Sequence, residues 1–192
     1  MFDRRVNDWV TVDAYLFDVS FDDGLSTEVD VNPEFGDTAT ARAVADKYSD
    51  VIGRLPTALR RNVDNVWIHK GTQPFGGGNH SLLIHVGQAD SYEADGILEE
   101  TLVHEATHTS LDSLVTADPD WQTAQNGDGT FISTYARDNP TREDVAESFL
   151  PYLAIRYRAD RISKGMADTI KATIPHRIDF FDQLSLDVHP IN

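Results

Sequence analysis

Two histidines four residues apart constrain this chain more than any other feature. The segment His104-Glu105-Ala106-Thr107-His108 lies in a stretch with helical spacing of apolar residues. Residues four apart on a helix share one face, so the two imidazoles can point at one metal ion. Glu105 lies about 100° further round the axis, where it can reach a water molecule bound to that metal. The spacing therefore predicts a metal site on a helix.

The residues around this motif predict that the helix is buried. We expect it to run from near Ala94 to near Val115. Its apolar residues lie nearly all round the axis: Ile97, Leu98, Leu102, Val103, Ala106, Leu111 and Leu114. A helix with this pattern is typical of a protein core. Buried polar groups without partners are costly, so we favour a metal ion over an exposed helix that carries two histidines by coincidence.

The composition limits the kind of metal and the class of protein. The chain has no cysteine, so metal ligands must be His and carboxylate side chains, which suits zinc. We expect a single domain over its 192 residues, and no apolar run approaches the length of a membrane span, about 18 residues. The formal net charge of -16 disfavours nucleic acid and anionic membranes as partners.

Two regions near the start of the chain bear on location and on a second metal. Residues 1–5 are not a signal peptide, and we expect a monomeric protein that is secreted or exported after loss of its signal. The turn at Asp22, Asp23 and Gly24 is rich in carboxylates and raises calcium as a candidate. It lacks the regular spacing of an EF-hand loop, so we favour a solvated turn.

The first hundred residues alternate between strand and helix patterns. β-Branched and aromatic residues predict strands over residues 9–21, 27–31, 63–69 and 81–86. A helix should cover residues 39–52 after an N-cap at Asp37, and a short one residues 56–61. We interpret His69, His80 and His85 as strand or loop residues and not as ligands.

The strand over residues 81–86, Ser-Leu-Leu-Ile-His-Val, comes just before the metal helix. We expect it at the sheet edge beside the cleft, where it can pair with an extended protein or peptide substrate. An ordinary core strand is an equal alternative. The glycines at 76–78 precede no helix, so they indicate a loop of flexible or closely packed backbone and not a nucleotide cradle.

A second informative stretch follows the metal helix. Thr141 and Asp144 have the spacing of a capping box, so a helix should begin at Thr141 with Asp144 in its cap. Glu143 and Glu147 lie four apart on that helix among apolar residues. Two carboxylates that face a core repel each other unless a cation lies beside them. One can bind the metal while the other accepts the free N–H of a ligand histidine; an exposed face with unrelated acids is the alternative.

Three motifs together resemble one family. They are His-Glu-x-x-His followed by an Asp, Tyr-Ala-Arg-x-Asn-Pro over residues 135–140, and Glu-Asp-x-Ala-Glu-Ser-Phe over residues 143–149. The combination is similar to gluzincin metallopeptidases of the kind represented by the catalytic domain of anthrax lethal factor and the small clostridial Pro-Pro endopeptidases. The resemblance covers His104 to about Leu184, and the first hundred residues fit only the general plan.

The resemblance implies a zinc endopeptidase with one Zn²⁺ per chain. It implies that Glu143 is the third metal ligand beside His104 and His108. It further implies that Glu147 supports a ligand histidine and that Tyr135 assists the transition state.

Other residues carry weaker assignments. Asp112 lies four residues after His108 and either supports a histidine or is simple surface charge. Asp128, in a Gly-rich loop, is a possible aspartate ligand in another class of zincin. A metzincin would need Gly at position 111 and His at position 114, and both are Leu.

These expectations combine into an α+β, zincin-like metallopeptidase domain. We expect a small, mostly antiparallel N-terminal sheet, with its edge strand over the active-site helix, and a helical C-terminal half. The C-terminal helices should cover residues 143–157, with a bend at Pro151, residues 163–173 and residues 175–184. Four apolar residues should bury against the metal helix: Ile178, Phe180, Phe181 and Leu184.

The expected function is hydrolysis of peptide bonds. Zinc lowers the pKa of a bound water, Glu105 takes its proton and later gives it to the leaving amine, and Tyr135 hydrogen-bonds the developing oxyanion. The alternative is a catalytically silent binding module that keeps its zinc for structure. A third possibility is an acidic, cation-buffering protein in which the histidine pair is incidental.

Overall fold

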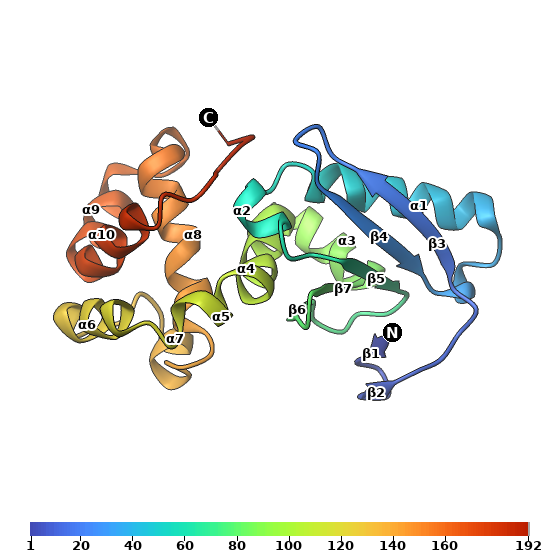
Figure 1. Ribbon diagram of the computed structural model, residues 1–192, viewed down its shortest axis with the longest axis horizontal. Coiled ribbons are helices and arrows are strands. Elements are labelled where there is room, and N and C mark those ends of the chain that lie inside the picture. Colours follow the sequence, from blue (N-terminus) through green and yellow to red (C-terminus); the bar gives the residue numbers. More distant parts are fainter. Residues whose placement is uncertain (192) are drawn as a thin grey trace.

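The N-terminal half of the chain forms a five-stranded sheet. The computed structural model describes residues 1–191 (Figure 1). Across the sheet the strands follow the order β3, β4, β5, β7 and β6. Their bounds, in that order, are Tyr15–Ser20, Ser26–Val31, Asn65–His69, Ser81–His85 and Gly76–Gly78. The strands predicted near residues 27–31, 63–69 and 81–86 are confirmed, whereas residues 76–78, predicted as a loop, form β6.

The sheet combines antiparallel and parallel pairs. β3 pairs with β4, and β6 with β7, in antiparallel orientation. The central pairs, β4 with β5 and β5 with β7, are parallel. A parallel pair needs a crossover connection, and helices α1 (Thr38–Ile52) and α2 (Thr57–Arg60) lie in the one between β4 and β5. The predicted antiparallel character therefore holds at the two margins of the sheet and not at its centre.

Strand β7 is a core strand. It lies between β5 and β6, and all five of its residues are buried. The prediction that residues 81–86 form the sheet edge is wrong, and the core-strand alternative is confirmed. The edge on this side is β6, which contacts helix α4 (Leu98–Ser110).

One face of the sheet packs against helices. Alternating side chains of three strands are fully buried there: Val29, Val31, Val66, Ile68, Leu82 and Ile84. Helix α1 contributes Ala41, Ala45 and Ile52 to the same core. Its N-cap is Asp37, which accepts a hydrogen bond from the Thr40 N–H, as the sequence predicts.

The opposite face carries a short N-terminal hairpin. Strands β1 (Phe2–Asp3) and β2 (Asp8–Trp9) pair with each other and form a separate two-stranded sheet (Figure 1). Trp9 packs edge-on against Trp67 of β5, with ring centroids 5.2 Å apart. The strand predicted over residues 9–21 is therefore two separate strands, β2 and β3.

The C-terminal half is helical, as predicted (Figure 1). After α4 come α5 (Asp112–Val115), α6 (Pro119–Asp128), α7 (Thr134–Asp138), α8 (Asp144–Tyr157), α9 (Lys164–Thr173) and α10 (Pro175–Gln183), and α3 (Val86–Ala94) precedes it. The N-cap Ser163 and the first residue Pro175 of the last two helices are where the sequence predicts. The metal helix is shorter than predicted, because residues 94–115 contain α4 and the separate α5. Within residues 1–191, no helix combines the length and the apolar character that crossing a bilayer requires.

An aromatic cluster holds the last helices together. Phe180 and Phe181 of α10 each lie with ring centroids 5.4 Å from that of Trp121 in α6. Phe181 also packs against Phe149 and Tyr152 of α8. The prediction that these residues bury against the metal helix is wrong about the partner, because α10 packs mainly on α6 and α8.

Candidate metal centre

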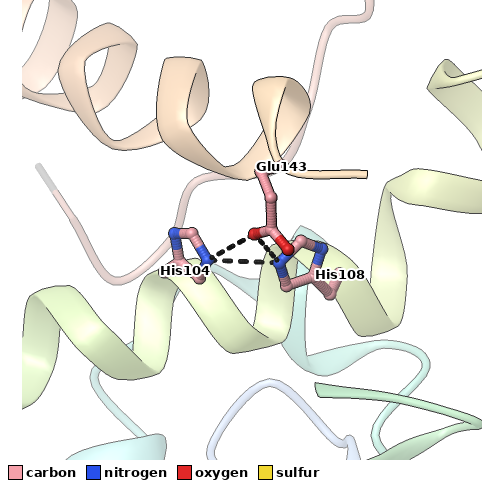
Figure 2. Close-up of side chains that lie close together, drawn as sticks. All are labelled: His104, His108 and Glu143. Atoms are coloured by element: carbon pink, nitrogen blue, oxygen red, sulfur yellow. Dashed lines mark hydrogen bonds and ion pairs between the residues drawn. The ribbon is translucent and has the colours of Figure 1, made fainter. Parts of the chain in front are cut away.

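Helices α4 and α8 bring two histidines and a glutamate together. His104 and His108 lie on consecutive turns of α4, and Glu143 immediately precedes α8 (Figure 2). The Nε2 atoms of the two histidines are 3.1 Å apart. Glu143 Oε2 lies 3.1 Å from His108 Nε2 and 3.4 Å from His104 Nε2. Within the described residues, these three make the one group of His and carboxylate side chains close enough to hold a metal ion together.

The three atoms are spaced within a few tenths of an ångström of the ligand atoms around a tetrahedral metal ion. Metal–ligand bonds of about 2.0–2.2 Å place neighbouring ligand atoms about 3.3–3.6 Å apart. The observed separations run from 3.1 to 3.4 Å. When each outer nitrogen carries its ring's proton, the two facing nitrogens are both acceptors, and a cation between them receives a lone pair from each. The group therefore fits a metal ion.

Carboxylates lie at the outer nitrogen of each histidine ring. Asp112 Oδ2, from the first residue of α5, is 2.8 Å from His108 Nδ1. Glu147 Oε1 is 3.4 Å from His104 Nδ1. A carboxylate accepts a hydrogen bond, so it keeps the proton on Nδ1 and leaves the lone pair of Nε2 facing the centre. Asp112 and Glu147 both lie where they can orient a ligand histidine.

The environment shifts the pKa of two side chains on α4. Burial lowers the pKa of His108, but the hydrogen bond to Asp112 and the nearby carboxylates outweigh it, so the net shift is upward. Burial raises the pKa of Glu105, and the two histidines oppose this only in part. Glu105 therefore takes up a proton more readily than an exposed glutamate, which suits a group that transfers protons.

Helix α8 begins three residues later than predicted. It starts at Asp144, and Glu143 occupies the N-cap position with 4% of its surface exposed. Residues 141–143 form a turn, in which the Glu143 N–H donates to the Asn139 carbonyl oxygen. The capping box predicted at Thr141 is therefore wrong. The four-residue spacing to Glu147 survives, because the Glu147 N–H donates to the Glu143 carbonyl oxygen at 2.8 Å.

Asp144 forms a buried ion pair in place of the predicted cap. Arg177 of α10 donates from Nε to Asp144 Oδ2 at 2.9 Å and from Nη1 to Asp128 Oδ2 at 2.7 Å. All three side chains are fully buried. Asp128 also accepts the backbone N–H groups of His176 and Arg177. The network joins α6, α8 and α10 next to Glu143, and it engages Asp128 away from the metal site.

The candidate ligands line a cavity of about 490 Å³, together with Glu105 and Tyr135. Tyr135 lies in the short helix α7 and is 51% exposed. Partial burial and the neighbouring Glu143 carboxylate raise the pKa of its phenol, so the hydroxyl keeps its proton at neutral pH. The structure thus brings both predicted catalytic residues to the same cavity as the predicted ligands.

Several residues of this cavity were missed by the sequence interpretation. Arg4 from the N-terminal hairpin and Arg142 from the turn before α8 place cations in its wall, and β6 contributes Gly77 and Gly78. An ideal Cβ at Gly77 would lie 1.8 Å from the Glu105 carbonyl oxygen, so only glycine lets the strand approach α4 this closely. The run of three glycines is the sequence signal that could have found β6. No local pattern connects Arg4 with the metal helix.

The Asp-rich turn is anchored to helix α2 by Asp23. Its carboxylate accepts hydrogen bonds from the Thr57 hydroxyl and from Arg60, whose Nη2 lies 2.6 Å from Asp23 Oδ2. The partners of the Asp23 carboxylate are thus side chains of the protein itself, as in a structural turn.

No family model, no curated protein and no solved structure matches the chain. The relationship to the gluzincins therefore remains a prediction from the three sequence motifs.

Proposed function

We propose that the protein is a zinc-dependent endopeptidase. The convergence of His104 Nε2, His108 Nε2 and Glu143 Oε2, at 3.1 to 3.4 Å from one another, carries the proposal. Two histidines and a glutamate suit zinc, and three protein ligands leave a fourth position free, as in catalytic zinc sites. The resemblance of the motifs to gluzincins supports the same function.

Each side chain of the cavity then has a distinct task. When bound, zinc polarises a carbonyl group and lowers the pKa of a water molecule. Glu105 accepts the proton of the attacking water and later delivers it to the leaving amine nitrogen, and its raised pKa favours that delivery. Tyr135 donates a hydrogen bond to the scissile carbonyl oxygen as negative charge develops there, a contact worth roughly 3 kcal/mol.

The sheet edge beside the cavity suits a polypeptide substrate. β6 pairs with β7 on one side and, within residues 1–191, with no strand on the other. An unpaired edge offers backbone N–H and C=O groups to an extended chain. β6 therefore takes the role that the sequence interpretation gave to residues 81–86.

Digestion of a peptide library, with and without a zinc chelator, tests this proposal. Zinc-loaded protein should cleave internal peptide bonds, and chelation should stop cleavage. Glu105→Gln should keep one zinc per chain and lower kcat by about 10²- to 10⁴-fold, because the proton acceptor is lost. Glu100→Gln changes an exposed glutamate on the same helix and should cleave at the wild-type rate.

Three results would contradict parts of the proposal. Cleavage by Glu105→Gln at the wild-type rate would exclude Glu105 as the base. A protein that binds one zinc but cuts no peptide would favour the silent binding module. A chain that takes up no zinc would favour the acidic, cation-buffering protein.

A further inference from the structure

A second cavity, of about 590 Å³, lies on the open face of the sheet. The N-terminal hairpin supplies Phe2 and Trp9 to its wall, while β5 and β7 supply Trp67 and Leu83. Its volume falls within the range of ligand pockets, about 300–1,000 Å³. None of these four residues belongs to the metal site or to the motifs that predicted it.

The register of the sheet makes the floor of this cavity apolar. Trp67 pairs with Leu83, and Leu83 pairs with Gly76, so the three form one row across β5, β7 and β6. Residues paired in this way point to the same face of a sheet. Gly76 ends the row without a side chain, and an ideal Cβ there would lie 2.8 Å from Arg4 Nη2. The Arg4 guanidinium therefore lies against Gly76, in space that a side chain at this position would need.

Two aromatic residues form the wall above this floor. Trp9 packs edge-on against Trp67, and Phe2 packs edge-on against Trp9 with ring centroids 5.8 Å apart. Trp9 nevertheless keeps 59% of its surface exposed. Exposed aromatic side chains that border a cavity are typical of binding sites, because a ligand that covers them removes apolar area from water.

The second cavity, called the aromatic cavity below, meets the cavity that contains the candidate metal ligands, called the metal cavity, at the edge strand β6. Both are lined by Arg4, Pro74, Gly77 and Gly78. A polypeptide that lies along the edge of β6 therefore borders both cavities at once. Because the two cavities are continuous, we infer that the aromatic cavity holds a segment of the same polypeptide whose bond is cut at the metal site.

We propose that the aromatic cavity is a specificity subsite for one bulky apolar side chain of the substrate, at a position away from the cleaved bond. The subsite presupposes the peptidase function proposed above and adds the class of substrate. Trp9 and Trp67 supply aromatic contacts, and Leu83 supplies the floor. Phenylalanine, tyrosine, tryptophan or leucine should therefore be preferred there over glycine, alanine or a basic residue.

The library digest gives the first measurement. Wild-type protein should enrich a bulky apolar residue at one position outside the two that flank the cleaved bond. One cleaved peptide is then compared with its analogue that has alanine at that position. Trp9→Ala should lower kcat/KM about tenfold for the apolar peptide, mainly through KM, and should change the analogue by less than about twofold.

Leu16→Ala is the matched control. Leu16 is 58% exposed, lies in the same cross-strand row through Asp30 and Trp67, and is outside the cavity. This variant should leave kcat/KM unchanged for both peptides. An equal loss for both peptides with Trp9→Ala, or a library without the additional preference, would overturn the subsite and leave the peptidase standing.

If the wild-type protein cleaves no peptide, the peptidase function is wrong. Peptide binding then tests separately whether the aromatic cavity holds a bulky apolar side chain. Peptides rich in bulky apolar residues should shift the tryptophan fluorescence of Glu105→Gln, because Trp9 and Trp67 line the cavity while Trp121 is buried in the helical half. Adding Trp9→Ala should weaken the apparent Kd about tenfold, and adding Leu16→Ala should not. Absence of any shift, or an unchanged Kd with Trp9→Ala, would overturn the subsite.

Discussion

Two histidine pairs in this protein have the same composition and opposite surroundings. His104 and His108 lie on one helix, with carboxylates at both outer nitrogens and a third carboxylate between the inner ones. His69 and His85 lie opposite each other on β5 and β7, with stacked rings whose centroids are 5.6 Å apart. Both strand histidines are fully buried.

The partners of His69 use its lone pair. Asn32 Nδ2 lies 3.0 Å and Arg5 Nη2 3.3 Å from His69 Nδ1, and both groups are donors, so Nδ1 is the acceptor. The proton is then on Nε2, which donates to the Phe2 carbonyl oxygen at 3.1 Å. Asp3, at 3.8 Å from Nδ1, is itself paired with Arg5.

The difference teaches that the partners and the burial of the ring nitrogens together decide what a histidine pair becomes. Carboxylates hold the protons of the helical pair on the outside and direct two lone pairs at one centre, which favours a cation. The amide of Asn32 and the guanidinium of Arg5 already donate to the lone pair of His69, which leaves none for a metal ion. Burial lowers the pKa of both strand histidines, so they stay neutral. The interpretation of His69 and His85 as strand residues agrees with this arrangement.

Removal of a ligand from the helical pair should have the largest effect. His108→Ala should lower zinc affinity by at least about a thousandfold, because a binding free energy of roughly 10–16 kcal/mol is shared among few ligands. His69→Ala should keep one zinc per chain. Elemental analysis after gel filtration, with competition against a zinc-binding dye, measures both. One zinc per chain in His108→Ala would contradict the view that the helical pair binds the metal and the strand pair does not.

The second-largest effect should come from the buried ion-pair network that joins α6, α8 and α10 beside the candidate metal site. Arg177→Met leaves the carboxylates of Asp144 and Asp128 buried without their cation and should lower the free energy of unfolding by about 3 kcal/mol. Arg156→Met removes a more exposed ion pair with Asp182 and should cost less than about 1 kcal/mol. Urea unfolding of the metal-free variants compares them. Equal costs would show that the buried network stabilises the fold no more than the exposed pair does.

Loss of the outer carboxylates should weaken the metal site without removing it. Asp112→Asn and Glu147→Gln should each lower zinc affinity by about 10- to 100-fold. The effect should be greater for Asp112, which lies 2.8 Å from its histidine against 3.4 Å for Glu147. Asp168→Asn, on the exposed face of α9, serves as the control. Wild-type affinity in both variants would contradict the role given to the outer nitrogens.

The smallest effect should be the pH dependence of stability that His85 of the strand pair causes. Burial, with a smaller contribution from His69, lowers the pKa of His85 to about 4, below the value of about 6.5 in an unfolded chain. The unfolded state therefore binds the proton first, and the stability that neutral His85 contributes is present above pH 6.5 and lost as the pH falls toward 4. Between pH 7 and pH 6 the loss should be less than about 1 kcal/mol.

Comparison with His85→Phe isolates this contribution. Urea unfolding of the metal-free proteins at several pH values between 7.5 and 6 gives the difference in unfolding free energy. The wild type should lose stability relative to His85→Phe as the pH falls. A difference that does not change with pH would show that His85 does not titrate in this way.

Features that depend on neighbours in the sequence could be predicted. The cap at Asp37 and the starts of α9 and α10 follow from single residues and their spacing. The positions of His104 and His108 follow from the helical repeat, because one turn of backbone fixes both. Glu143 and Glu147 keep their spacing although the helix begins after Glu143, since the backbone hydrogen bond between them is already helical.

Features that depend on distant partners could not be predicted. Asp144 has the local spacing of a cap, but Arg177 lies 33 positions later in the chain and binds its carboxylate instead. β7 pairs with β5 in parallel orientation across a connection that contains β6, so nothing within residues 81–86 shows that they lie inside the sheet. Arg4 reaches the cavity through the packing of the hairpin on Trp67, which no periodic pattern records.

Gly77 lies directly against the peptide unit of Glu105. No rotatable side chain separates the two, so main-chain geometry alone sets how far the sheet margin stands from that residue. A polypeptide added to this margin would be aligned with the carboxylate independently of its own sequence. Discrimination among substrates would then have to come from pockets beside the edge of β6. A single methyl group at position 77 would misalign every substrate alike.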